Sequence, residues 1–233
     1  MQQRVGEEVR RSVGLYVNNA IYFTLGKNAS MSHPLMYVSG GTQEYEFPLI
    51  LAIGREPNYD EDIDDAVGII NDEEFRSMSG GVWVTAYTQF AKQCFGNKAT
   101  SRQLKNICFE KNASPIVFAN AFPITIPNSV TNKAELRNKL IAGFPAHIAK
   151  IFNKPLSRRF GLVVQHGADK TEASALATEL IVSECGKRGI PYCSSPFFYN
   201  GNSGKIQSAL SEVAPVIQSI FAQFIDGGFN AEA

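Results

Sequence analysis

Four short apolar runs along the chain have the length of buried β-strands, and they lie at residues 48–53, 116–119, 160–164 and 190–193. Longer stretches with helical spacing of apolar residues alternate with them; these cover 82–95, 100–111, 131–152, 167–186 and a last segment that ends near 224. Such alternation predicts a parallel sheet with helices on both faces. We therefore predict an α/β fold.

The remaining segments flank this pattern. We predict one domain over residues 1–233, with its core at 48–225. Before the core, residues 1–47 are predicted to hold an amphipathic helix and then an irregular segment with a short extended piece at 35–38. The small, polar residues 226–233 are expected to fray.

Residues 55–80 predict a long acidic loop with one helical turn near 72–76. Its carboxylates crowd together at Asp60, Glu61, Asp62, Asp64, Asp65, Asp72, Glu73 and Glu74. A solvated acidic lid is one interpretation and a divalent-ion site is the other. The spacing lacks the glycine turn and the terminal glutamate of a calcium loop, so no metal site is predicted here.

Polar residues follow each of the four apolar runs. They are Glu56, Asn120, His166 and Ser195. Right-handed crossovers bring the carboxyl ends of parallel strands to one edge of a sheet, where ligands bind in open α/β folds. We therefore expect these four side chains to share one edge, which becomes the candidate site.

Composition narrows the class of protein. The chain has 233 residues, of which 44% are hydrophobic and 19% charged, and its formal net charge is zero. A neutral chain has no global attraction for nucleic acid, so such a partner would need a local basic patch. The chain has no apolar run long enough to span a membrane, and its N-terminus lacks the apolar core of a signal peptide, so a cytoplasmic protein is expected.

Cofactor motifs are missing from the sequence. The four cysteines form no Cys-x-x-Cys pair and the three histidines have no ligand spacing, so metal binding is not predicted. The sequence also lacks Gly-x-Gly-x-x-Gly after a strand, a phosphate loop ending in Gly-Lys-Ser/Thr, and a Gly-x-Ser-x-Gly elbow. No cofactor is expected, and an unrelated hydrolytic or nucleotide-binding α/β domain is the less favoured interpretation.

The ends of the four runs resemble the motifs of the uracil-DNA glycosylase superfamily, in order and spacing over 48–210. Gly54-Arg55-Glu56-Pro57 is similar to its Gly-x-x-Pro motif, and Phe118-Ala119-Asn120-Ala121 to the strand end whose asparagine reads a pyrimidine edge. Leu162-Val163-Val164-Gln165-His166-Gly167 resembles its third strand. Cys193-Ser194-Ser195-Pro196 stands where the family's last motif, His-Pro-Ser-Pro or a relative, occurs, with Cys193 or Ser194 in the place of the histidine.

The resemblance implies a three-layer α/β/α sandwich around a four-stranded parallel sheet. It also implies catalytic roles for Glu56, which would position or deprotonate water, and for Asn120, which would bind the base. Gly54, Arg55, Pro57 and Asn58 would help to bind substrate, the first through backbone N–H groups that follow it. Either Phe75 or Trp83 would stack on the base.

The loop that contains Ser194, Ser195, Pro196 and Phe197 would enter the minor groove of DNA, with Phe197 or Phe198 as a wedge; the alternative for both rings is core packing. His166 would bind a developing anion, or would be a buried histidine bonded to backbone. Phosphates could meet the basic side chains, which are otherwise solvated: Lys98, Arg102, Lys105, Lys111, Arg158 and Arg159.

Two functions are therefore expected from the resemblance. The first is a divergent glycosylase that hydrolyses the N-glycosidic bond of uracil or another modified base in DNA. The alternative is a non-catalytic relative that binds nucleic acid or a nucleotide, an interpretation that the neutral charge and the missing histidine favour. The expected partner is DNA, a nucleobase or a nucleotide and not a membrane, and the sequence does not specify an oligomeric state.

Overall fold

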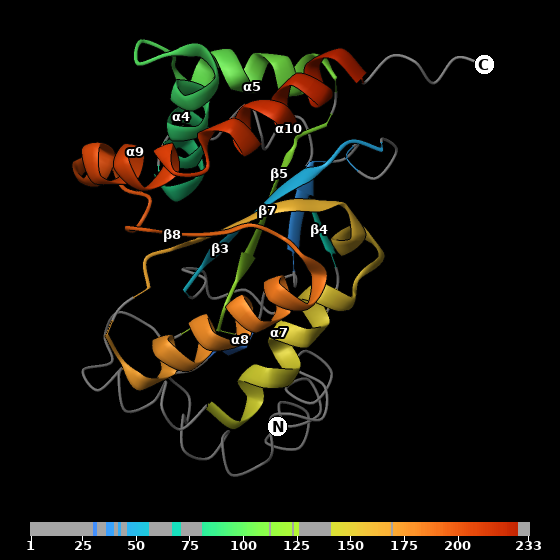
Figure 1. The fold of residues 1–233 in the computed structure, drawn as a ribbon, viewed down its shortest axis with the longest axis vertical. Helices are drawn as coiled ribbons and strands as arrows, with labels where there is room; N and C mark the ends of the chain where they lie inside the picture. The colour runs from blue at the N-terminus through green and yellow to red at the C-terminus, as the bar shows by residue number, and fades with distance from the viewer. Residues whose placement is uncertain are drawn as a thin grey trace.

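A six-stranded sheet lies at the centre of the computed structural model, which describes residues 30–31, 36–39, 42, 46–55, 67–70, 81–111, 113–122, 124–125, 141–168 and 170–227 (Figure 1). The order of its strands is β4 (Val67–Ile70), β2 (Met36–Ser39), β5 (Ile116–Asn120), β3 (Leu49–Gly54), β7 (Phe160–His166) and β8 (Tyr192–Ser195). The strands β5, β3, β7 and β8 are all parallel, which confirms the predicted four-stranded parallel sheet.

Two further strands extend this parallel sheet beyond the prediction. β2 pairs antiparallel with β5 and parallel with β4, so the complete sheet is mixed. β2 overlaps the extended piece expected at 35–38, whereas β4 lies within the segment predicted as a continuous acidic loop, which corrects that prediction. A separate antiparallel pair joins β1 (Ser30–Met31) and β6 (Ile124–Thr125).

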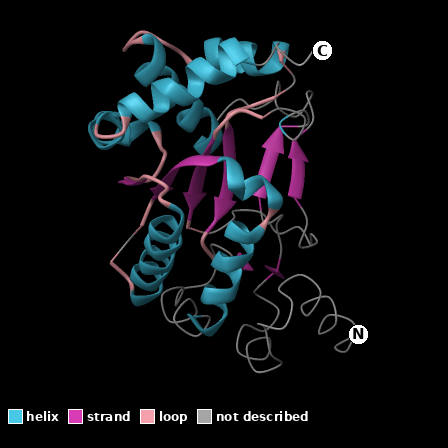
Figure 2. Ribbon diagram, turned by 45° about the vertical axis from the view of Figure 1, so that its right-hand side comes forward, coloured by secondary structure: helices cyan, strands magenta, loops and turns pink. Residues whose placement is uncertain are grey.

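Helices lie on both sides of the sheet, in agreement with the layered arrangement that the resemblance implies (Figures 1 and 2). One side holds four helices: α4 (Gly81–Phe95), α5 (Ser101–Glu110), α9 (Ser203–Ser211) and α10 (Ala214–Gly227). The other side holds α7 (Phe144–Asn153) and α8 (Glu172–Arg188). Short 3₁₀ segments are η4 (Ile141–Gly143), η5 (Pro155–Arg159) and η6 (Asn200–Asn202).

Burial explains why the parallel strands read as continuous apolar runs. Every residue of β3 is buried, and residues 49–53 have no exposed surface, because helices cover both faces of the sheet. Contacts from alternate residues identify the two faces. The ring of Trp83 on α4 packs on Phe118, with centroids 4.0 Å apart, whereas Gln165 Nε2 donates to Thr178 Oγ1 of α8 at 3.0 Å.

The order of the parallel strands creates a switch point at β3. From β3 the chain crosses to β5 on one side through α4 and α5, and from β5 it returns past β3 to β7 through α7, on the opposite face. Adjacent crossovers that leave in opposite directions open a crevice at the carboxyl ends of the strands. The switch point therefore lies where β3 and β7 end, at Gly54 and His166.

The structure moves the ends of three predicted elements. The helix expected to stop near Gly186 continues to Arg188, and Gly189 ends it in the left-handed region at φ 64°. The fourth strand begins two residues later than expected, so Ser194 and Ser195 belong to β8 rather than to the loop after it. The last helix is two helices, α9 and α10, with a 90° bend between them, because Pro215 has no N–H to donate to Ser211 O at the end of α9.

Several predictions fall on residues outside the described ranges. They concern the N-terminal helix, the helical turn near 72–76, residues 131–140 of the helix predicted over 131–152, and the tail after 227. Of that predicted 131–152 helix, the part from Phe144 is confirmed as α7. Among the described residues, no single helix is long and apolar enough to cross a membrane.

Candidate functional site

Three of the four predicted polar strand ends meet at one edge of the sheet. Asn120 ends β5 opposite Gly54 of β3, and His166 ends β7 opposite Ser195 of β8. Glu56 follows Gly54 by two residues, but it lies outside the described ranges with Pro57, Asn58 and Phe75. The shared edge is therefore confirmed for Asn120, His166 and Ser195 and stays a prediction for Glu56.

The side chains of Asn120 and His166 converge over Gly54. A Cβ atom placed on Gly54 would lie 3.0 Å from His166 Nε2 and 3.1 Å from Asn120 Oδ1. Any larger residue on β3 would therefore push these two groups apart. The missing side chain of Gly54 is what lets the carboxamide and the imidazole approach the β3 backbone this closely.

Backbone hydrogen bonds fix the ends of β3 and β5 beyond the sheet ladder. Ala121 N donates to Gly54 O at 2.8 Å, and Phe122 N donates to Arg55 O at 2.8 Å. These bonds hold Asn120 in register with Gly54, and they hold half-buried Arg55 at the start of the segment that leads to Glu56. On the other side of the switch point, Gly167 N donates to Ser195 O at 3.0 Å.

His147 of α7 is a site residue that the sequence analysis missed. Its Nε2 lies 2.8 Å from the backbone oxygen of Asn120. A carbonyl can only accept, so Nε2 of His147 carries the proton in this contact. The available signal was position: His147 lies in the first turn of the helix that follows β5, and a crossover helix starts near the carboxyl edge.

His166 is buried against two aromatic rings. Phe198 stacks on it at 4.3 Å and 8°, and Phe197 lies at 5.6 Å and 46°. Burial lowers the pKa of His166 to about 3, so the imidazole is neutral near pH 7 and offers one donor and one acceptor. Its Nδ1 is buried without a hydrogen-bond partner in the described part of the chain, which corrects the alternative of a histidine bonded to backbone.

The two serines of the last motif face opposite sides of the sheet. Ser195 is buried beside His166, and its hydroxyl donates to Pro196 O at 3.1 Å, so its proton is used within its own turn. Ser194 is exposed and lies on the same face as Tyr192, whose hydroxyl donates to Gln165 Oε1. Because side chains alternate along β8, only Ser195 lies on the same face of the sheet as its paired residue His166.

The two phenylalanines after Pro196 divide between the predicted roles. Phe198 is fully buried and meets Phe90 of α4 edge-on at 6.0 Å, so it belongs to the core. Phe197 is 42% exposed and covers Gly167, where a Cβ would lie 2.7 Å from its Cδ2 atom. Phe197 is therefore the ring of this pair that is available to a partner.

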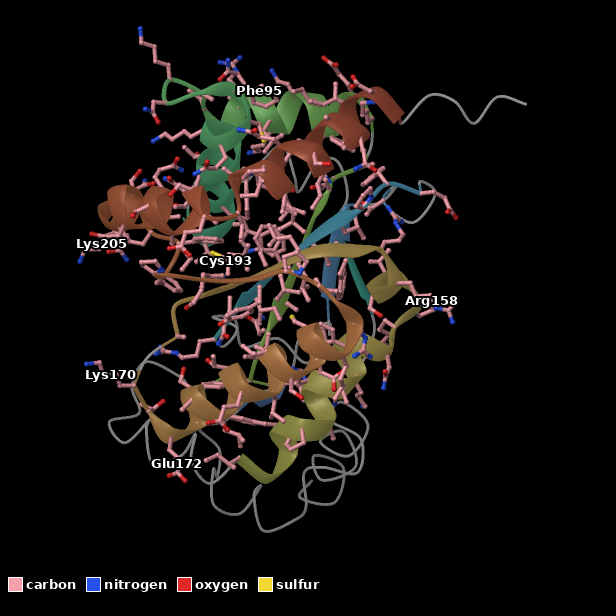
Figure 3. The ribbon with its side chains drawn as sticks, viewed as in Figure 1. Phe95, Arg158, Lys170, Glu172, Cys193 and Lys205 are labelled. Atoms are coloured by element: carbon pink, nitrogen blue, oxygen red, sulfur yellow. The ribbon has the colours of Figure 1, made fainter. Side chains whose placement is uncertain are left out.

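Trp83 and Cys193 lie on the side of the sheet that α4 and α9 cover. Trp83 is half-buried and packs on Phe118, two residues before Asn120 on the same face of β5. Cys193 is one of the two residues, with Ser194, that the resemblance sets in the place of the last-motif histidine. Cys193, labelled in Figure 3, is buried, and its thiol donates to Ala209 O of α9 at 3.4 Å. Burial raises its pKa to about 11, so the thiol is not a nucleophile at neutral pH.

The chemistry of this edge is that of hydrogen bonding rather than of metal binding. Among the described residues, no three His, Cys, Asp or Glu side chains gather to hold a metal ion. The edge offers a carboxamide and a neutral imidazole on either side of a glycine, with one exposed ring beside them. Such a set suits a flat, uncharged, polar ligand.

Comparison with known proteins adds no family to this description. No protein-family model matches the chain, and no curated protein matches it.

Proposed function

We propose that the carboxyl edge of the sheet binds a nucleobase of DNA or of a nucleotide, and that the chain hydrolyses its N-glycosidic bond as a divergent relative of the uracil-DNA glycosylases. One observation carries the proposal: Asn120 Oδ1 and His166 Nε2 approach the same point above Gly54 at the switch point of the sheet. The proposal keeps the cytoplasmic location that the sequence predicts.

The polar groups of this edge match the edge of a pyrimidine. The Asn120 amide presents an acceptor and a donor together, which suits the adjacent carbonyl and N–H of uracil. The neutral His166 supplies a further hydrogen bond to the base without adding a charge. When the glycosidic bond breaks, negative charge develops on the departing base, and preorganised donors at this position lower the barrier.

Glu56 is assigned the sugar side of the reaction from its place in the sequence. The sugar becomes positively charged in the oxocarbenium-like transition state, and a carboxylate both stabilises that charge and activates water. Glu56 comes two residues after Gly54 in the sequence, and Gly54 is the residue over which Asn120 and His166 converge. This assignment rests on the resemblance of Gly54-Arg55-Glu56-Pro57 to the family's first motif.

Aromatic residues would hold a base outside the DNA stack. Taking a base out of duplex DNA costs a few kcal/mol, and contacts in the pocket must offset that cost. Phe197 is 42% exposed at this edge and is proposed to contact the duplex. Trp83 is the stacking candidate of the predicted pair that the structure describes, and it lies on the same face as Asn120.

The test is incubation with a uracil-containing oligonucleotide, followed by alkaline cleavage of abasic sites. Cleavage is expected with the native chain, and Glu56→Gln is expected to remove it. Asn120→Ala is expected to reduce cleavage by about a hundredfold, because the base loses the hydrogen bonds from both the donor and the acceptor of the amide. Asn106→Ala, on the exposed face of α5, is the matched control and should cleave normally. Equal cleavage by the native chain and Glu56→Gln would exclude the enzymatic proposal.

A non-catalytic nucleobase-binding relative is the second candidate, and the burial of Cys193 favours it. The position at which the family's last motif usually carries a histidine holds a thiol bonded to α9, so no imidazole comes from that strand. This candidate predicts no cleavage but saturable binding of a uracil nucleotide that survives Glu56→Gln and weakens in Asn120→Ala. Unchanged binding by Asn120→Ala would show that the ligand, if any, binds elsewhere.

A further inference from the structure

A cavity of about 500 Å³ opens at the opposite edge of the sheet from Asn120 and His166. It lies where α7 and α8 end and β7 begins, next to η5. Figure 3 shows Arg158 projecting from this end of the molecule, far from Lys170, which follows the carboxyl end of β7. The volume lies within the range of small-ligand sites. Its lining residues are Phe152, Asn153, Lys154, Ser157, Arg158, Phe160, Arg188 and Ile190.

The cavity combines an apolar floor with a cationic wall. Phe152 and Phe160 are buried, with 1% and 5% of their surface exposed, and they meet edge-on at 6.2 Å. The lining includes two arginines and a lysine but no aspartate or glutamate. Because the whole chain has a formal net charge of zero, this is a local concentration of positive charge.

Arg188 is held in place by the cavity wall. Its Nη2 donates to Phe152 O at 3.3 Å and to Asn153 Oδ1 at 3.2 Å, and its guanidinium lies 5.4 Å from the centre of the Phe152 ring. Its Nη1 pairs with the Glu184 carboxylate. Glu184 also accepts from Lys187 Nζ at 2.6 Å, so this single carboxylate is shared between two cations.

The carboxyl end of α7 explains the positions of Arg188 and of Lys154, which is the C-cap residue of α7, but not that of Arg158. The carboxyl ends of helices carry partial negative charge, and Arg188 satisfies a terminal carbonyl of α7. Arg158 belongs to η5 instead, is exposed, and makes no hydrogen bond or ion pair with any described residue. Lys154 lies between α7 and η5, on the same wall.

We infer that this cavity binds a small organic phosphate, with its phosphate group against Arg158 and Lys154 and its apolar or aromatic part over Phe152, Phe160 and Ile190. Guanidinium groups bind phosphate oxygens in pairs, and the fixed Arg188 adds to the positive potential. A lone phosphate would leave most of a 500 Å³ cavity empty, which is why an attached apolar group is included. This inference is independent of the nucleobase site at the other edge.

The test measures binding of 1-naphthyl phosphate by titration calorimetry, with 1-naphthol and inorganic phosphate as separate probes. Naphthyl phosphate is expected to bind most tightly, because it alone satisfies both parts of the cavity. Arg158→Glu should weaken its binding by about tenfold or more, since an attractive charge becomes repulsive. Lys205→Glu makes the same change of charge at an exposed position of α9, and it should bind as the native chain does.

Three outcomes would overturn the inference. They are no saturable binding at millimolar probe, equal affinity for naphthyl phosphate and naphthol, and equal affinity in the native chain and Arg158→Glu. Asn120→Ala provides the remaining control: it should bind naphthyl phosphate normally, whether or not the nucleobase proposal is correct. Loss of naphthyl phosphate binding in that variant would place the probe at the carboxyl edge and would also overturn the inference.

Discussion

The two edges of the parallel sheet differ in how far their buried polar side chains connect segments of the chain. At the amino edge, Arg159 donates from Nε to Phe47 O at 2.9 Å and from Nη1 to Thr42 O at 2.8 Å, although its Nη2 is buried without a hydrogen-bond partner among the described residues. At the carboxyl edge, His166 is nearly as buried as the core, yet its Nδ1 has no hydrogen-bond partner among the described residues. Arg159 therefore joins two segments of the chain by hydrogen bonds, whereas the buried Nδ1 of His166 joins none among the described residues.

A second network at the amino edge follows the same rule. The hydroxyls of Tyr87 and Ser114 lie 2.8 Å apart, and Ser114 N donates to Thr42 Oγ1 at 3.0 Å. All three residues are buried, and these bonds connect α4, the start of β5 and the segment before β3. The polar groups of this network therefore stabilise the fold directly.

The difference indicates where a ligand would be accommodated. A buried polar group without a partner costs about 1–3 kcal/mol, and such groups are retained where they serve another purpose. At the carboxyl edge this cost falls on a neutral histidine whose imidazole lies close above Gly54, beside the Asn120 amide. The predictions below test whether stability depends on the amino edge and binding on the carboxyl edge.

The largest effect is expected from Arg159→Met, which removes the guanidinium but keeps a long apolar stem. Two backbone carbonyls, of Phe47 and Thr42, lose their donor, and the stacking of the guanidinium 4.9 Å from the Phe47 ring is lost. We expect the free energy of unfolding to fall by about 3 kcal/mol. Urea denaturation measures this change. Arg158→Met, at the exposed neighbour, should change it by less than about 0.5 kcal/mol, and equal losses in both variants would contradict the structural role of Arg159.

Gly54→Ala should weaken ligand binding at the carboxyl edge. The new methyl group would lie 3.0 Å from His166 Nε2 and 3.1 Å from Asn120 Oδ1, so it would displace the two groups that are proposed to bind the base. We expect nucleotide binding to weaken by about a hundredfold, the effect of overpacking a site by 2–3 kcal/mol. Fluorescence titration with a uracil nucleotide measures it.

Gly161→Ala is the matched control for Gly54→Ala. Gly161 lies near the start of β7, and its added Cβ would meet Ile220 Cδ1 at 3.2 Å and Pro48 Cβ at 3.3 Å, a similarly tight fit at the amino edge. Both variants should lose stability, but only Gly54→Ala should lose binding. Parallel loss of binding in both would mean that the effect comes from general destabilisation of the sheet.

Burial on both faces is the reason that the sheet could be predicted from the sequence. Strands covered by helices on both sides contain few polar residues, so 48–53, 116–119 and 160–164 stand out as apolar runs. β8 is less regular, because Ser194 and Ser195 pair with β7 through backbone groups that any side chain permits. Gly186 resembled a helix end, but a helix tolerates an internal glycine, and only Gly189 has the positive φ that ends α8.

The residues of the candidate site were likewise only partly predictable from the sequence. Asn120 and His166 were predicted because each follows an apolar run, and parallel pairing brings such positions together. His147 was missed because it bonds to a backbone carbonyl, which is available at every residue and leaves no pattern in the sequence. Ser194 and Ser195 point in opposite directions because both belong to β8, which begins and ends two residues later than the predicted strand.

The pH dependence of stability tests whether His166 is buried and neutral. Its pKa is about 3 in the folded chain and near 6.5 when unfolded, because burial disfavours the charged ring. Below pH 6.5 the unfolded chain therefore binds more protons, and stability falls as the pH is lowered. Between pH 7 and pH 5 we expect this group to remove about 2 kcal/mol. His166→Phe should flatten the slope by that amount; an unchanged slope would show that His166 takes up a proton as readily in the folded chain as in the unfolded chain.

The smallest effect is expected from Tyr87→Phe, which removes one hydroxyl from the amino-edge network. Ser114 Oγ loses its contact at 2.8 Å but still accepts from Ile116 N at 3.1 Å, so the serine hydroxyl keeps a hydrogen-bond partner. The free energy of unfolding should therefore fall by only about 1 kcal/mol, the usual net value of one hydrogen bond. Urea denaturation measures the loss, and nucleotide binding should be unchanged, because the network lies at the edge away from Asn120. If Tyr87→Phe weakened binding as much as Gly54→Ala, the two edges would be coupled, and the division of stability and binding between them would be wrong.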